Sequence, residues 1–155
     1  MLYPHAYHIT WGTYGARLHG SDRPNVDRDH NEYGTPFAPA DPEKKESARR
    51  RMTQSPVTLS PQQRKEIEQA IRDFTTRFGF KIHAIAIQSD HAHVVITADR
   101  VGDELREALK ACASRALNQK YGKRKWWAEN GSTKWLWEWD YFENATDYVA
   151  RQRDF

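Results

Sequence analysis

Alternating apolar and polar residues near the start of the chain predict a β-strand. The apolar positions of AYHITWGTY are Tyr7, Ile9 and Trp11, and the positions between them are His8, Thr10 and Gly12. Successive side chains of a strand point to opposite faces, so this spacing separates an apolar face from a more polar one. We therefore expect a strand over residues 5–13 with its apolar face in the core.

Two longer segments repeat apolar residues every three or four positions, which is the spacing of an amphipathic helix. Segment 60–79 starts with Ser60 and Gln63, a pair that forms a capping box. Its apolar stripe is Ile67, Ala70, Ile71, Phe74 and Phe78. In segment 104–122 the stripe is Leu105, Ala108, Leu109, Cys112, Ala116 and Leu117. We expect Asp103 to cap this second helix and both helices to pack on a sheet.

Shorter apolar runs predict the remaining elements. Residues 80–88 and 91–98 are expected to be two strands joined by a tight turn at the Ser-Asp dipeptide between them. Residues 123–139 mix aromatic and basic side chains around a Gly-Ser turn and predict a strand or hairpin with loop character. Residues 140–152 predict a short terminal helix that packs through Phe142, Ala145 and Val149.

The order of these elements is typical of an α+β fold. Strand, long loop, helix, strand, strand, helix, strand and terminal helix predict a ferredoxin-like or RRM-like plait, with helices packed on one face of an antiparallel sheet. The stretch at about 15–57 has several Gly and Pro and no apolar period, so we interpret it as a long polar insertion. Within it, Asp41 and Pro42 begin a segment that predicts a short solvated helix. We expect residues 1–155 to form a single domain.

Composition narrows the class of protein. The apolar fraction of 38% includes six Trp and argues for a folded chain. The sequence has no apolar run near the roughly 20 residues of a membrane span, and its first residues lack the basic head and apolar core of a signal peptide. Cys112 is the only cysteine, which excludes an intrachain disulfide, and we expect it to be a small core residue. These features predict a cytoplasmic protein without a membrane partner.

Candidate chemistry begins with His91 and His93 in the sequence SDHAHVVITAD. One residue separates them, so a strand places both imidazoles on the same face, as a metal site requires. Tyr148 and Gln152 are four residues apart on the terminal helix and share a face there. Two imidazole nitrogens and the oxygen of Gln152 would leave open positions on a divalent ion for phosphate oxygens, and Tyr148 could attack the polarised phosphorus. Taken singly, each of these residues also fits a structural role.

The HAH sequence after a hairpin, with YVARQ on a late helix, resembles the single-tyrosine HUH transposases. This family comprises the insertion-sequence-200-like and REP-associated tyrosine transposases, and the similarity runs from about Tyr7 to Gln152. The resemblance implies an RRM-like catalytic domain, usually a homodimer, that binds imperfect hairpins of single-stranded DNA and uses Mg²⁺ or Mn²⁺. It assigns His91, His93 and Gln152 as metal ligands and Tyr148 as the nucleophile. Whether the tyrosine helix docks on its own subunit or on a partner stays open.

A basic, aromatic region predicts where DNA would bind. The net charge is only +3, but residues 104–134 hold eight cations against three acids. The cations are Arg106, Lys110, Arg115, Lys120, Lys123, Arg124, Lys125 and Lys134. The tryptophans Trp126, Trp127, Trp135 and Trp137 lie among them, and we expect one or two to be exposed for stacking on bases.

Two other functions stay open from the sequence. The first is a domesticated hairpin-DNA or RNA binding protein of the same fold without transposition activity, although binding alone requires neither Tyr148 nor Gln152. The second is a metal-dependent phosphoesterase whose histidines activate water. A phosphoesterase predicts a hydrolysed product and no covalent adduct.

Overall fold

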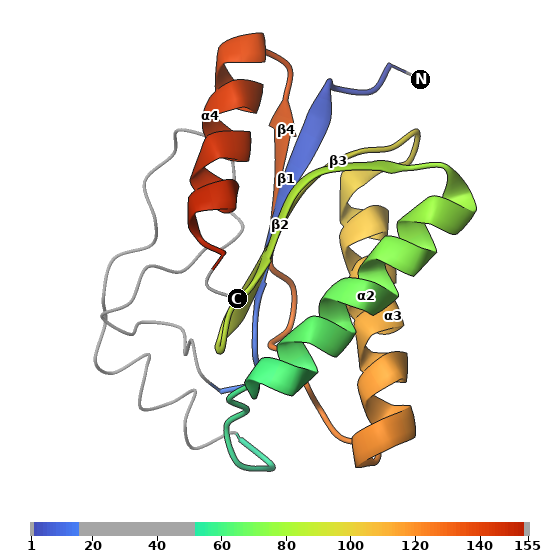
Figure 1. Cartoon of the computed structure of the whole chain (residues 1–155), viewed down its shortest axis with the longest axis vertical. Helices are drawn as coiled ribbons and strands as arrows, with labels where there is room; N and C mark the ends of the chain where they lie inside the picture. Colours follow the sequence, from blue (N-terminus) through green and yellow to red (C-terminus); the bar gives the residue numbers. More distant parts are fainter. Residues whose placement is uncertain (1, 16–51, 154–155) are drawn as a thin grey trace.

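The fold is described from a computed structural model, which places residues 2–15 and 52–153. Four strands form one antiparallel sheet in the order β2-β3-β1-β4, and the helices lie on both of its faces (Figure 1). The strands are β1 (Ala6–Gly12), β2 (Lys81–Ile87), β3 (His91–Thr97) and β4 (Ser132–Leu136). The helices are α2 (Pro61–Phe78), α3 (Gly102–Tyr121) and α4 (Trp139–Arg151). The predicted α+β plait is confirmed, but the expectation that the helices pack on one face is wrong, because α4 covers the face opposite α2 and α3.

The helices on the two faces of the sheet bury very different amounts of apolar surface. Helices α2 and α3 cover one face, and α4 covers the other (Figure 1). The α2/α3 side contains the large core cluster, in which Trp11, Ile71 and Leu109 are almost fully buried. The α4 side contains a small cluster in which alanine supplies half of the buried residues, and the larger buried side chains are Val95, Leu136 and Val149. The terminal helix therefore has a much smaller apolar contact than the other two.

Local sequence signals explain the start of α2 but not the start of α3. Ser60 and Gln63 form the predicted capping box. The prediction that Asp103 caps α3 is wrong, because α3 begins at Gly102 after Val101 and has no side-chain cap. A Cβ on Gly102 would lie 2.5 Å from Cγ2 of Thr133, so close packing against β4 requires glycine at this first position.

The burial of α3 also differs from the predicted stripe. Residues Leu105, Leu109, Ala113 and Leu117 are fully buried at intervals of four. Cys112 is only partly buried, and its thiol donates to the carbonyl of Ala70 on α2. Cys112 is therefore a packing residue at the edge of the α2/α3 contact, and its burial raises the pKa of the thiol.

Two predictions from the sequence fall wholly or partly outside the described residues. The polar insertion at about 15–57 overlaps residues 16–51, and the short helix expected after Asp41 lies almost entirely within that range. At the end of the insertion, the amide of Val57 donates to the carbonyl of Tyr14, and the amide of Leu59 donates to that of Ser89. In the part of the chain that is described, none of the helices combines the length and apolar character needed to cross a bilayer.

Candidate active site

His91 and His93 share one face of β3, as predicted. The two rings lie perpendicular to each other with their centroids 4.7 Å apart, and both residues are buried. Across the sheet, His93 pairs with Thr10 of β1 and His91 pairs with Gly12. This face is the one that α4 covers, and the pair lies at the end of the sheet formed by the β2–β3 turn.

Each histidine has one ring nitrogen in a contact that fixes the ring. Nδ1 of His91 lies 2.6 Å from Oδ1 of Asp90. Nδ1 of His93 lies 3.1 Å from Oγ1 of Thr10 and 3.2 Å from Nε2 of His8. A metal-binding histidine commonly uses one nitrogen in this way and presents the other to the metal. Nε2 would therefore be the ligand atom of both residues.

The terminal helix brings Tyr148 to this pair. The Tyr148 ring lies perpendicular to that of His93, 5.6 Å away between centroids, and its centroid is 6.2 Å from that of His8. The neighbouring Val149 is fully buried against the sheet and sets the rotation of the helix. Tyr148 itself is 44% exposed, so its phenol can meet a ligand from solvent.

Gln152 lies one turn beyond Tyr148, at the C-cap of α4. Nε2 of Gln88 donates to the backbone oxygen of Gln152 at 2.9 Å and lies 3.3 Å from its side-chain Oε1. The amide of Gln88 in turn donates to the carbonyl of His91 at 2.8 Å. Gln88 thus ties the end of α4 to the strand end that carries the histidines.

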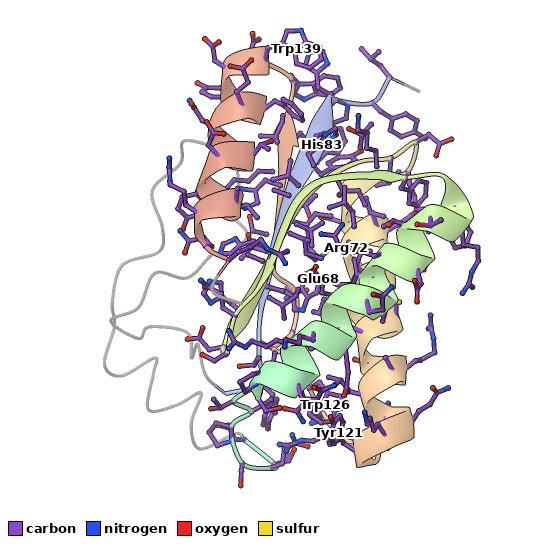
Figure 2. The ribbon with its side chains drawn as sticks, in the orientation of Figure 1. Glu68, Arg72, His83, Tyr121, Trp126 and Trp139 are labelled. Carbon is purple, nitrogen blue, oxygen red and sulfur yellow. The ribbon has the colours of Figure 1, made fainter. Side chains whose placement is uncertain are left out.

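An ion pair at the edge of the sheet also anchors this end of α4. Nη1 of Arg153 donates to Oε1 of Glu68 on α2 at 2.8 Å and to the carbonyl of Ile85 on β2 at 3.0 Å. Figure 2 labels Glu68 and Arg72, which pair with each other on α2 at 3.0 Å. The terminal helix therefore docks on the sheet of its own chain here.

The donor atoms at this site fit a divalent ion bound through mixed ligands. Among the described residues, no three His, Cys, Asp or Glu side chains gather as a metal site. The third donor would therefore come from another residue type, and the carboxamide of Gln152 supplies an oxygen at the same end of the sheet. The carboxylate behind His91 supports this fit, because such a partner fixes the imidazole tautomer and raises its basicity.

His8 and Thr10 are part of the site, although neither is among the candidate residues predicted from the sequence. Both occupy polar positions in the alternating pattern of β1, and that pattern is the sequence signal that could have pointed to them. Burial, with a smaller effect from the charge of Lys134, lowers the pKa of His8 to about 4. His8 is therefore a neutral imidazole at neutral pH. Only the register between β1 and β3 reveals that it faces His93.

The predicted basic surface divides into buried and exposed parts. Arg106 and Lys110 are buried, which contradicts their expected place on that surface. Arg106 pairs with Asp103 and Glu107 and donates to Thr133, while Nζ of Lys110 donates to the carbonyls of Ala128 and Asn130. Both side chains hold the connection from α3 to β4 in place. Lys134 is half-buried and lies opposite His8 in the sheet register.

The exposed cations of this set are Arg115, Lys120, Lys123, Arg124 and Lys125. Lys120 pairs with Glu66 at 2.8 Å. The basic loop, which we define as residues 123–125, lies at the histidine end of the sheet. Tyr14 donates its amide to the carbonyl of Trp126, and the adjacent Thr13 donates its amide to that of Asp90. The end of β1 therefore connects the basic loop to the turn that precedes His91.

Of the four tryptophans named as stacking candidates, two are exposed, and these are not Trp126 and Trp127, which lie beside the basic loop. Trp126 is buried, and Trp127 is half-buried with its indole N–H donated to the carbonyl of Lys110. The exposed members of the group are Trp135 and Trp137, so the expectation that one or two are exposed is confirmed. Figure 2 shows Trp126 near one end of the molecule and Trp139, which is also exposed, near the other.

Comparisons with known proteins bear on both the family and the fold. No curated protein matches the chain. The structure of a REP-associated tyrosine transposase bound to a REP hairpin is similar at a TM-score of 0.55 and 12% identity, over 96% of this chain and 66% of that one. This chain thus spans just under two thirds of that protein, and the likeness concerns the fold. A proposed transposase from Deinococcus radiodurans R1 matches at a TM-score of 0.48 and 16% identity, over 100% of this chain and 95% of that one. The profile of the family described as "Transposase IS200 like" matches residues 51–152, which include both histidines, Tyr148 and Gln152. The chain therefore belongs to the IS200-like transposase family.

Proposed function

We propose that this protein is a metal-dependent endonuclease and strand transferase that cuts and rejoins single-stranded DNA at hairpins through Tyr148. The observation that carries the proposal is the position of the Tyr148 phenol, exposed to solvent while its ring lies against the buried His93. A tyrosine with only a packing role has no need of paired imidazoles beneath it. Membership of a transposase family supports the same conclusion.

Tyr148 would act as the nucleophile. Its phenolic oxygen attacks the phosphorus of a phosphodiester and forms a 5′-phosphotyrosine bond, while the bond to the 3′ oxygen breaks. The phenol loses its proton to solvent, and the departing oxygen gains one from solvent to become a 3′-hydroxyl. One phosphodiester replaces another, so the reaction needs no nucleotide cofactor. A second 3′-hydroxyl can reverse the step and join a new strand.

His91, His93 and Gln152 would hold Mg²⁺ or Mn²⁺ in this site. When bound, the ion would supply Lewis-acid polarisation of the scissile phosphate. The chain contributes orientation: Asp90 and Thr10 hold the two imidazoles, and Gln88 holds the end of α4 that carries Gln152. These ligands are all neutral, so we expect the site to bind the ion weakly until substrate phosphates complete the shell.

The basic loop supports DNA as the substrate. Its cations lie at the same end of the sheet as the histidines, next to Tyr14 and Trp126, which pack with the core on the opposite face. The hairpin bound in the similar REP-associated transposase motivates hairpin DNA as the ligand to test first. A homodimer, expected from the family resemblance, stays a prediction that light scattering can check.

The test is to incubate the protein with labelled single-stranded hairpin DNA and Mn²⁺, and to look for a protein–DNA species that survives denaturation. Tyr148→Phe should bind the hairpin normally and form no such species, because only the phenolic oxygen is removed. The matched control is Tyr141→Phe on the same helix, which is seven residues earlier and 45% exposed against 44% for Tyr148. We expect the control to form the adduct at the parental level.

Other outcomes would overturn the proposal in distinguishable ways. Adduct formation by Tyr148→Phe would move the nucleophile to another residue. Cleavage by the parent protein without any adduct would indicate a phosphoesterase. Hairpin binding without cleavage under any divalent ion would favour a binding protein of the same fold.

A further inference from the structure

A third histidine lies beside the proposed metal ligand His93, on the neighbouring strand of the sheet. His8 on β1 is only 8% exposed, and its Nε2 lies 3.2 Å from Nδ1 of His93. Oγ1 of Thr10 completes a triangle, 3.1 Å from the His93 nitrogen and 3.4 Å from the His8 nitrogen. The contact joins β1 to β3 in the middle of the sheet, where both strands are fixed by neighbours on either side.

The position of one proton in this triangle decides which nitrogen of His93 can bind a cation. If His93 carries its proton on Nδ1 and donates it to His8, then Nε2 presents a lone pair. If His8 donates instead, a neutral His93 carries its proton on Nε2 and cannot ligate a metal through that atom. The distances between heavy atoms are compatible with both arrangements. Which nitrogen of His93 carries the proton depends on whether His8 accepts or donates in this hydrogen bond.

We propose that His8 is a positioning residue that accepts the Nδ1 proton of His93 and so holds Nε2 of His93 ready for the divalent ion. Oγ1 of Thr10, 3.1 Å from Nδ1 of His93, is a second acceptor for the same proton. The inference rests on the proposed function for the identity of the ligand, but it concerns a hydrogen bond that exists without any ion. His8 acts through His93 and would itself touch neither metal nor DNA.

The burial of the triangle makes the hydrogen bond specific. Water cannot easily replace His8 as the acceptor at a site where both imidazoles are more than nine-tenths covered. Loss of a partner behind a metal-binding histidine typically weakens metal binding about 10- to 100-fold. Thr10 remains after His8 is removed, so we expect a loss near the lower end, about tenfold.

The first measurement is the tautomer of His93 in the metal-free protein. Long-range correlation of ring protons with ¹⁵N should show His93 protonated on Nδ1 and unprotonated on Nε2. This readout depends on no variant, no metal and no activity. A His93 ring that is protonated on Nε2 in the metal-free parent would overturn the inference.

The second measurement is Mn²⁺ binding, followed by water-proton relaxation, in a small set of variants. His8→Phe keeps an aromatic ring but has no acceptor, and should bind Mn²⁺ about tenfold more weakly. His8→Gln can place a carboxamide oxygen near the lost nitrogen and should restore binding toward the parental value. His83→Phe is the matched control, because His83 also lies beneath α4, with its ring 4.8 Å from that of Phe142, and should bind like the parent.

The outcomes separate this inference from the proposed function. If the parent protein binds no Mn²⁺ even with hairpin DNA, the proposed metal site fails, and the tautomer of His93 still tests the role of His8. If His8→Phe binds Mn²⁺ like the parent, or if His8→Gln is no better than His8→Phe, the role of His8 fails while the metal site stands. Should His8→Phe not fold, the parental tautomer and His8→Gln decide the matter.

Discussion

Replacing Val149 with alanine should increase the population of molecules in which α4, the helix that carries Tyr148, has detached locally while the rest of the fold stays intact. Ala145 and Val149 are the buried residues of α4, and Val149 is the larger of the two. The cluster beneath α4 is small and half of its buried residues are alanine, whereas α2 and α3 share the large core. We expect α4 to open locally before the whole chain unfolds.

The magnitude follows from the burial of Val149, which is fully covered. Removing two buried methyl groups costs about 1.6 kcal/mol by transfer, and a small cavity brings the total to about 2 kcal/mol. Alanine is the better helix former and returns about 0.5 kcal/mol. The net loss of about 1.5 kcal/mol corresponds to roughly a tenfold rise in the open population of α4.

Hydrogen exchange of backbone amides measures this opening. In Val149→Ala the protected amides of α4 should exchange about tenfold faster, and so should amides of α2 and α3 that exchange only through global unfolding, because both openings start from the same destabilised native state. Ile71→Val, which trims the large core beneath α2, is the decisive control: it should accelerate the globally exchanging amides of α2 and α3 and leave those of α4 unchanged, because the local opening of α4 keeps Ile71 packed. Acceleration of the α4 amides in Ile71→Val would refute the reasoning, because it would show that α4 opens only with the whole domain.

Two further predictions concern stability. Gly131→Ala should destabilise the fold by at least about 1–3 kcal/mol more than Gly122→Ala, measured by denaturant unfolding. Both glycines have positive φ, but a Cβ at Gly131 would lie 2.5 Å from the carbonyl oxygen of Thr10, whereas one at Gly122 would meet nothing within 4 Å. Equal losses of stability in the two variants would contradict the prediction and show that β4 shifts to make room. For pH, burial, assisted by the charge of Lys81, lowers the pKa of His83 below its ordinary 6.5. The unfolded chain therefore binds a proton at His83 more readily than the folded chain does. The stability that the neutral His83 contributes is fully present above pH 6.5 and is lost as the pH falls through and below that value. His83→Gln should therefore show a smaller loss of stability on acidification than the parent, and an identical pH profile would contradict the assignment.

The sequence alone determined the features that depend on local spacing. The alternation in β1, the helical stripe of α2 and its capping box all follow from neighbours in the chain, and the structure confirms each. The same holds for the shared face of His91 and His93, because a strand has a period of two residues. The one-turn spacing of Tyr148 and Gln152 also needed only the helical repeat.

Tertiary structure decided which of these residues meet. His8 faces His93 because β1 and β3 pair in a particular register, and no local pattern encodes a contact 85 residues apart. Arg106 and Lys110 are residue types that bind phosphate on protein surfaces. In the structure the chain between α3 and β4 covers them, and both side chains donate hydrogen bonds to oxygens of that connection and of β4. Local periodicity specifies which face of an element is apolar, whereas burial of a polar side chain depends on what the rest of the chain lays over it.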